Sequence, residues 1–328
     1  MPLFWLKFRM WLLVAILFTI LYGIISAVAA GMGIGNFWFY LAMSLVMLFI
    51  QYMIGPKIIE WSMRVKYVGK SEYPKLYKIV EGLARSARIP MPRVALADIG
   101  IPNAFAFGRW SSDGRVCVTR GIMNLLSEEE LKAVLAHEVS HLKNRDVLTI
   151  TLLSVIPIIL YRVAFSLLWS GGNRRREGGA NPALIGMAAM IFYFITNLLV
   201  LYASRIREYF ADRGAVNLGA APNHLASALY KLVYGSARAS KESLKEVEGL
   251  KAFFANDPSC ALNEIKELRQ LDLDKSGTID SYELSALSAK QLNLGFGERL
   301  LEVMSTHPNM LKRIKQLSTY QGKGSMAG

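Results

Sequence analysis

Cysteine is scarce in this chain of 328 residues, which holds only Cys117 and Cys260. Two cysteines without a Cys-x-x-Cys spacing disfavour a disulfide-stapled secreted fold and a thiolate zinc site, although a single bridge between them stays open. Charged residues are scarce as well, at 19% of the chain, whereas 53% of the residues are hydrophobic. Soluble domains average roughly 25% charged residues, so this composition disfavours an ordinary soluble domain, and it excludes a mostly disordered chain.

Acidic residues are too few to balance the basic ones: 38 Lys and Arg against 25 Asp and Glu give a net charge of +13. In a soluble protein this excess would indicate nucleic-acid binding. In an apolar chain it is typical of the Lys and Arg that flank membrane spans on the cytoplasmic side, so we expect no nucleic-acid partner. The length predicts about two domain-sized units.

Two long apolar runs lie near the amino terminus. Met10–Gly31 and Phe37–Ile54 contain no charged residue over 22 and 18 positions. Each can cross a hydrocarbon core of about 30 Å, and both are predicted as transmembrane helices. A cleaved signal peptide is the alternative for the first run, although its length exceeds the usual apolar stretch of about 7–15 residues. Basic residues precede the first run and follow the second, so both flanks are expected on the cytoplasmic side.

A second apolar pair covers residues 147–169 and 182–203, joined by a loop with arginines at 174–176. If both helices cross the bilayer, these arginines must be translocated, and Arg162 lies inside the first helix. A hairpin that dips into the bilayer or lines the polar domain is therefore the alternative. In either arrangement the number of crossings is even, so the residues just before 147 and just after 203 are expected on the same side.

The polar remainder of the chain divides around this hairpin. We expect two transmembrane helices in 1–54, the first half of a catalytic domain in 55–146, the hairpin in 147–203, the second half in 204–320 and a disordered tail in 321–328. Helical periodicity covers residues 74–87, and short runs at 93–97 and 115–119 are typical of strands. The predicted fold class is a mainly α membrane protein with an α+β polar domain.

One predicted helix carries a metal-binding motif. Ser127 and Glu130 form a capping box that marks its start, and the motif HEVSH places His137 and His141 four residues apart on one face. Both imidazoles can then reach one zinc ion, which takes three protein ligands and a water in catalytic sites. Glu138 is predicted as the general base that takes a proton from the water and hands it to the leaving amine of a peptide.

A third zinc ligand is expected from the segment after the hairpin, because this segment returns to the side of the HEVSH helix. It contains Glu208, the candidate ligand, and one turn further Asp212, which suits an acceptor that orients a histidine ring. An acidic pair at this spacing is by itself a weak signal of a metal site. The signal becomes strong because the pair follows the hairpin and so lies opposite the histidine motif.

The chain resembles the HtpX-type membrane zinc metallopeptidases of the M48 group over most of its length. The features that carry the resemblance are two amino-terminal spans, NAFAFG at 103–108, the HEVSH helix running into KNRD at 143–146, the apolar hairpin, the helix with Glu208 and Asp212, and STHP at 305–308 followed by Arg313. The resemblance implies a zincin-like catalytic domain on the cytoplasmic side, in which His137, His141 and Glu208 bind zinc and Glu138 is the general base.

The resemblance also implies roles for two further segments. One segment would border the cleft and pair with the substrate backbone as an added strand; its residues are Asn103, Ala104, Phe105, Ala106, Phe107 and Gly108. In the other segment, His307 would stabilise the oxyanion, together with Arg313. The alternative for these two residues is structural, with His307 capping a helix and Arg313 pairing with an acidic neighbour.

A calcium-type loop, which the M48 pattern lacks, follows further along the chain. Residues 272–283, DLDKSGTIDSYE, match the twelve-residue EF-hand loop and predict an insertion over 261–290. The loop is solitary in the sequence, and a metal-free or magnesium-binding loop is the alternative. The expected calcium ligands are Asp272, Asp274, Ser276, Thr278, Asp280 and Glu283.

These features predict a multi-pass zinc endopeptidase of the cell membrane, with one zinc per chain, a cytoplasmic active site near the bilayer and modulation by calcium. Its expected substrates are misfolded or membrane-associated polypeptides, because the resemblance implies a role in protein quality control. A CAAX-type prenyl protease shares the chemistry, but such enzymes enclose their site in more spans than the two to four expected for this chain. A non-catalytic calcium-sensing chaperone or scaffold is the alternative from another class.

Overall fold

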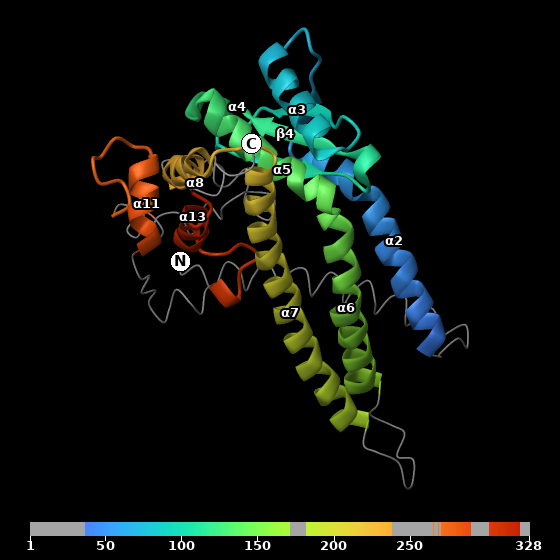
Figure 1. Ribbon diagram of the computed structural model, residues 1–328. Helices are drawn as coiled ribbons and strands as arrows, with labels where there is room; N and C mark the ends of the chain where they lie inside the picture. Colours follow the sequence, from blue (N-terminus) through green and yellow to red (C-terminus); the bar gives the residue numbers. More distant parts are fainter. Residues whose placement is uncertain are drawn as a thin grey trace. The chain divides into compact units, whose positions relative to one another are not determined.

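The computed structural model describes residues 37–170, 182–237, 265, 268, 270–289 and 302–321 (Figure 1). The chain divides after Ile54, Thr149 and Val200 into two compact units. The helical unit holds the described residues 37–54 and 150–200, and the α+β unit holds 55–149 and those from 201 onward. The expected span at 10–31 and the tail beyond Gln321 lie outside the described residues.

Three long helices contribute to the helical unit: α2 (Phe37–Ser62), α6 (Asp146–Ser170) and α7 (Pro182–Asn217). They correspond to the expected second span and to the two helices of the hairpin. Over the part of the chain that the structure describes, α7 is the one single helix long and apolar enough to cross a membrane. It continues without a break past residue 203, so the domain boundary expected there falls inside a helix.

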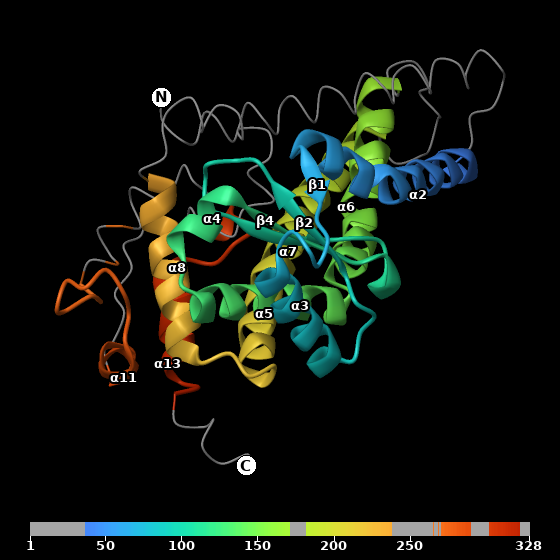
Figure 2. The same ribbon diagram turned by 90° about the horizontal axis from the view of Figure 1, so that it is seen from above.

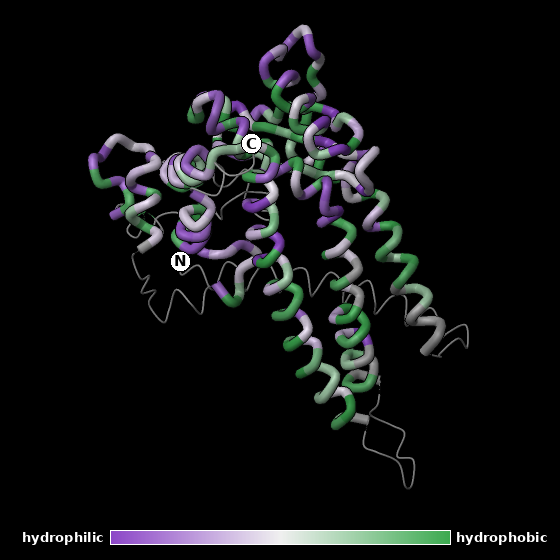
Figure 3. The backbone as a smooth tube through the Cα atoms, viewed as in Figure 1, coloured by the Kyte–Doolittle hydropathy of each residue, from purple (hydrophilic) through white to green (hydrophobic). Residues whose placement is uncertain are grey.

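The helical unit combines close packing between helices with an apolar outer surface. Helices α6 and α7 pack closely, because the rings of Tyr161 and Tyr193 lie 5.3 Å apart and a Cβ added to Gly186 would lie 2.9 Å from Leu168 Cγ. Large side chains such as Phe192 and Leu199 are exposed on α7. Figure 3 shows the hydrophobic residues running along α2, α6 and α7. An exposed apolar surface of this kind marks contact with a membrane or with another protein.

A four-stranded sheet forms part of the α+β unit. Its strands are β1 (Val65–Tyr67), β2 (Arg93–Ala97), β3 (Ala104–Phe107) and β4 (Arg115–Thr119), in the order β1-β2-β4-β3. Strands β2 and β4 run parallel, and the two outer strands pair antiparallel to their neighbours. The predicted strands at 93–97 and 115–119 are confirmed, and both lie in the centre of the sheet.

Side chains alternate across this sheet and enter two cores. One face, with Val94 and Val116, packs against α3 (Pro74–Ala87) and α5 (Glu128–Asn144). The other face, with Phe105, packs against Met63, the residue that follows α2. The predicted helix over 74–87 and the capping box that starts α5 at Ser127 are both confirmed.

The remaining described elements complete the α+β unit. They are the short helices η1 (Ser111–Asp113) and α4 (Arg120–Leu125), followed by α8 (Pro222–Ala237), α11 (Ser281–Ala289) and α13 (Met310–Ser318). Helix α8 contacts α5 and α13, and α13 also contacts α11; α8 and α13 lie side by side in Figure 2. These contacts join the segment after the calcium-type loop to the helix that carries the histidine motif.

Candidate metal centre

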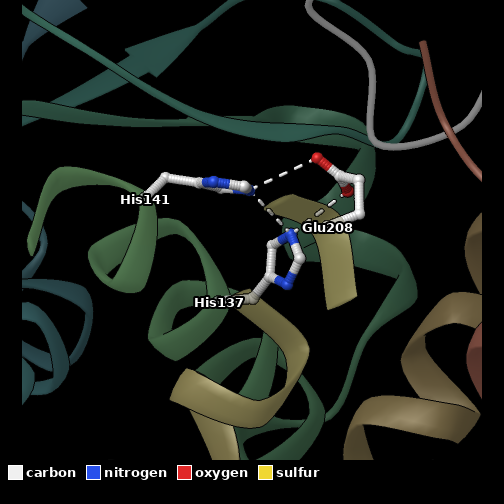
Figure 4. Close-up of side chains that lie close together, drawn as sticks. All are labelled: His137, His141 and Glu208. Carbon is white, nitrogen blue, oxygen red and sulfur yellow. Dashed lines mark hydrogen bonds and ion pairs between the residues drawn. The ribbon is translucent and has the colours of Figure 1, made fainter. Parts of the chain in front are cut away.

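Helices α5 and α7 carry the histidine motif and the acidic pair to one place in the α+β unit. His137 and His141 lie on α5, and Glu208 points toward them from α7 (Figure 4). The two helices approach closely at Gly214, where an added Cβ would lie 1.9 Å from Ser140 Oγ. A side chain at residue 214 would therefore push Glu208 away from the histidines.

The possible ligand atoms of these three side chains face one another. His137 Nε2 and His141 Nε2 are 3.1 Å apart; His137 Nε2 lies 3.5 Å from Glu208 Oε2, and His141 Nε2 lies 3.5 Å from Glu208 Oε1. A tetrahedral zinc ion with ligands at about 2.0–2.1 Å requires separations of about 3.3 Å between its ligands. The measured separations fit that geometry, and two imidazoles with one carboxylate form a donor set that zinc prefers.

Each histidine ring is oriented by a carboxylate on its other nitrogen. His137 Nδ1 lies 2.9 Å from Asp212 Oδ1, and His141 Nδ1 lies 2.5 Å from Asp146 Oδ2. A neutral imidazole that donates its Nδ1 proton to a carboxylate leaves a lone pair on Nε2. Two such lone pairs facing each other at 3.1 Å repel unless a cation lies between them, so the arrangement fits a bound metal.

Asp146 was not predicted as a partner of the metal site. It follows His141 by five residues, and Arg145, with φ of 55°, ends α5 in the left-handed conformation and turns the chain back toward that histidine. The signal in the sequence was an aspartate at the start of an otherwise apolar helix. A lone carboxylate there also suits the amino-terminal end of a helix dipole, so the sequence alone does not distinguish the two roles.

Arg313 is buried beside the acidic pair. Its Nε and Nη2 donate to the two oxygens of Asp212 at 2.9 and 2.7 Å, and its Nη1 lies 3.2 Å from Glu208 Oε2. Burial works to raise the pKa of Asp212 and of Glu208, but neighbouring cationic groups hold both pKa values below the ordinary range. All three guanidinium nitrogens of Arg313 therefore face carboxylates, which is the ion-pair arrangement that the sequence left as an alternative.

Glu138 lies between the metal ligands and the edge of the sheet. It is buried, and its Oε2 accepts the backbone N–H of Ala106 at 2.8 Å. Burial raises the pKa of Glu138. Strand β3 lies at the edge of the sheet, and the Thr119 N–H donates to the Asn103 carbonyl. Because hydrogen-bonded and non-hydrogen-bonded pairs alternate along an antiparallel ladder, the N–H and C=O groups of Ala104 and Ala106 point away from β4. The expected segment 103–108 thus borders Glu138 with the edge that does not pair with β4.

His307 also approaches the cluster. Its Nδ1 lies 3.6 Å from Glu208 Oε2, and its side chain is 19% exposed. Its backbone N–H donates to Ser305 Oγ at 3.3 Å. The structure therefore brings His307 to the same carboxylate as the two motif histidines, with part of its ring open to solvent.

The calcium-type loop forms a second acidic cluster, separate from the first in sequence. Carboxylate oxygens of Asp272, Asp274 and Glu283 lie within 4.8 Å of one another. The backbone N–H of Gly277, at φ of 79°, donates to Asp272, and Asp280 Oδ1 accepts the N–H of Glu283 at the start of α11.

The remaining expected calcium ligands lie within the same loop. Ser276 Oγ and Thr278 Oγ1 are 2.9 Å apart. Tyr230, from α8, donates to Asp272 Oδ2 at 3.0 Å and joins the loop to the rest of the α+β unit.

The α+β fold, the buried histidine motif and the glutamate across from it define a metal-dependent peptidase. The model of Peptidase family M48 matches residues 70–321 of the chain. The chain belongs to this family and is a metallopeptidase.

Curated relatives extend this result to whole proteins. Protease HtpX homolog of Methanothermobacter thermautotrophicus is 51% identical over 228 residues, which cover 70% of this chain and 86% of that protein. Protease HtpX homolog 2 of Methanosarcina acetivorans is 36% identical over 275 residues, covering 83% and 81%. These likenesses identify the chain as an HtpX-type membrane metallopeptidase.

A solved structure shares the fold. The crystal structure of S. mikatae Ste24p matches 94% of this chain with a TM-score of 0.50 at 17% identity. This chain covers 66% of that protein, so it spans just under two thirds of its length. At this identity the likeness concerns the fold alone.

Proposed function

We propose that this chain is a zinc endopeptidase of the cell membrane whose ion is held by His137, His141 and Glu208. The observation that carries the proposal is the set of separations of 3.1–3.5 Å between their donor atoms. Asp212 and Asp146 hold the two rings, and Arg313 holds Asp212 and Glu208 in turn. When bound, zinc would lower the pKa of a water molecule and polarise a peptide carbonyl.

Glu138 acts as the general base in this proposal. Its carboxylate accepts a proton from the attacking water and returns it to the leaving amine. Burial raises its pKa and thereby makes it a stronger base than an exposed glutamate, while the hydrogen bond from Ala106 fixes one of its oxygens. The other oxygen is left for the proton transfer.

The remaining residues bind and orient the substrate. An extended peptide pairs with the outer edge of β3 along Asn103–Gly108, where the backbone of Ala104 faces away from β4. His307 donates to the developing oxyanion from its partly exposed position. Because the guanidinium of Arg313 is occupied by two carboxylates, we assign this residue to holding the ligands rather than to the oxyanion.

The membrane supplies the substrates in this proposal. The enzyme is multi-pass and cuts misfolded or membrane-associated polypeptides on the cytoplasmic side. The separation of Glu208 from residue 203 and of His141 from residue 147 is only five or six positions, which keeps the ligands near the ends of the apolar segments. The Lys and Arg that flank the runs before 10 and after 54 support the cytoplasmic side.

The loop at 272–283 binds calcium and modulates the peptidase in this proposal. Its twelve-residue pattern, with Gly277 at the turn and Glu283 at the closing position, supports calcium over a plain surface loop. Helix α11, which follows the loop, contacts α13, the helix of Arg313, and this contact gives the loop a route to the metal ligands. Calcium titration of the wild type and of Glu283→Gln, read by peptidase activity, tests it: equal rates with and without calcium in both proteins overturn the modulation.

Purified full-length protein in detergent tests the peptidase. We expect cleavage of casein that stops with a zinc chelator, returns on addition of zinc, and is lost in Glu138→Gln while the zinc stays bound. Cleavage of a farnesylated peptide with none of casein would favour the prenyl protease. Cellular function that survives Glu138→Gln would favour the scaffold.

A further inference from the structure

Arg205 lies on α7 one turn before Glu208, and its side chain is buried, at 8% exposed. Its Nη1 donates to three main-chain carbonyl oxygens: Glu302 at 2.9 Å, Val303 at 3.0 Å and Ser305 at 2.7 Å. One nitrogen atom, with at least one of its two N–H groups shared between carbonyls, therefore contacts three points of the segment that leads to His307.

The carbonyls of Glu302 and Val303 belong to a helical turn that ends at Met304, and the carbonyl of Ser305 follows it, two residues before His307. Ser305 N donates back to Glu302 O at 3.0 Å, which closes the turn. Apart from this bond to Glu302, carbonyls at the end of a helix lack a partner within the helix and need one from elsewhere. Arg205 supplies that partner from α7, the same helix that supplies Glu208.

The segment is also closed on itself. The carboxylate of Glu302 accepts the N–H of Asn309 at 3.4 Å and pairs with Lys312. His307 donates its N–H to Ser305 Oγ, and Pro308 restricts the backbone of the residue before it to extended conformations. The segment is therefore held together internally; Arg205 fixes its first part to α7, and Arg313 fixes the helix that follows it.

The geometry points to Arg205 as a positioning residue: it anchors the segment 302–307 to α7 so that His307 faces the reaction centre at Glu208. This inference rests on the role of His307 in the proposed function. Arg205 and Glu208 are three residues apart on one helix, so the anchor fixes the distance between His307 and the carboxylate, which is 3.6 Å. Without the anchor His307 would no longer be held at the oxyanion, although zinc and the general base stay in place.

Five variants of the full-length protein test the inference. They are Arg205→Met, Arg205→Lys, His307→Gln, the double variant Arg205→Met/His307→Gln, and Arg213→Met. The last is the matched control, because Arg213 lies on the same helix and is exposed. We expect Arg205→Met to lower kcat by about 10- to 100-fold, since a misplacement of about 1 Å can cost about that much, with KM changed by less than about twofold.

The pattern across the variants distinguishes positioning from a structural role. Arg205→Lys should recover much of the loss, because all three bonds come from one nitrogen and an ammonium carries three donors. The double variant should be no slower than His307→Gln, since an anchor for a histidine that is gone has nothing left to position. In metal-free protein, amide exchange at residues 302–309 should speed up in Arg205→Met and not in Arg213→Met.

Other results overturn the inference. Losses that multiply in the double variant, a change in KM alone, or amide exchange unchanged at 302–309 would show that Arg205 does not act through His307. If Arg205→Met does not fold, the same cycle run with Arg205→Lys decides: a loss that persists in the His307→Gln background contradicts the inference. If His307→Gln keeps the wild-type kcat, the oxyanion role itself fails and the inference fails with it, whereas an inactive wild type would instead contradict the proposed peptidase.

Discussion

The cluster of His137, His141 and Glu208 and the loop at 272–283 differ in how the fold builds them. The first joins side chains more than sixty positions apart in sequence, and carboxylates of Asp146 and Asp212 hold its rings. The second takes its carboxylates from twelve consecutive residues, held mainly by the backbone N–H groups of the same loop. The first therefore depends on the packing of α5 against α7, and the second on local turn geometry.

This difference predicts how far the effect of a substitution extends from each site. At the histidine cluster the loss of one charged partner leaves the others buried and unpaired, because Glu208, Asp212 and Arg313 are all buried. At the loop, Asp274 is exposed and water can replace a missing contact. Variants of the first site should change stability and metal affinity together, whereas variants of the loop should stay local.

Replacing Arg313 is the largest test of this contrast. Arg313→Met leaves two buried carboxylates without their cation, which we expect to lower the free energy of unfolding by about 3–5 kcal/mol. Thermal unfolding of the detergent-solubilised protein, followed by circular dichroism, measures it. The exposed Arg213→Met is the control and should stay within about 0.5 kcal/mol. Equal losses in both variants would contradict a buried charge network.

The second-largest effect is expected on metal affinity, when a carboxylate that orients a histidine ring loses its charge. Asp146→Asn weakens the bond that orients His141, and such partners are typically worth about 10- to 100-fold in metal affinity. Competition with a zinc indicator measures the affinity. Asp98→Asn, an exposed aspartate paired with Arg120, is the control and should bind zinc as the wild type does. Unchanged affinity in Asp146→Asn would separate this carboxylate from the metal site.

The closing glutamate of the loop tests its independence. Glu283→Gln removes a charge from the three carboxylates and should weaken calcium binding by at least about tenfold, which is about 1.4 kcal/mol. Calorimetric titration with calcium measures it, and zinc content should stay at one ion per chain. Loss of zinc in this variant would mean that the two clusters are not built separately.

The contact from α8 is the smallest test. Tyr230→Phe removes one hydrogen bond to Asp272, worth about 0.5–1.5 kcal/mol, so calcium affinity should change by less than about tenfold. Tyr282→Phe, exposed in the same segment, is the control. A much larger change in Tyr230→Phe would show that the loop depends on tertiary packing after all.

The same contrast explains what the sequence could predict. Local features followed from spacing: the capping box at Ser127, helix α3, the central strands and the twelve positions of the calcium-type loop. Glu208 required one argument from topology, that the chain returns to the same side after the hairpin. Each of these rests on short spacing or on an even number of crossings.

Long-range partners could not be predicted in this way. The bond from Asp146 to His141 depends on the left-handed turn at Arg145, and the anchor from Arg205 joins atoms about a hundred positions apart. The segment at 103–108 is expected to pair with substrate, but the place of β3 at the sheet edge follows from the strand order, and the backbone groups that face outward follow from its register with β4. These features depend on which surfaces meet, and no local pattern encodes that.

Anomalous scattering at the zinc absorption edge, from crystals of zinc-loaded Glu138→Gln protein, tests the central claim most directly. The account predicts one strong peak bonded to Nε2 of His137, Nε2 of His141 and the carboxylate of Glu208 at about 2.0–2.2 Å, and none at the loop. A zinc ion bound without Glu208, or found only among Asp272, Asp274 and Glu283, would contradict it.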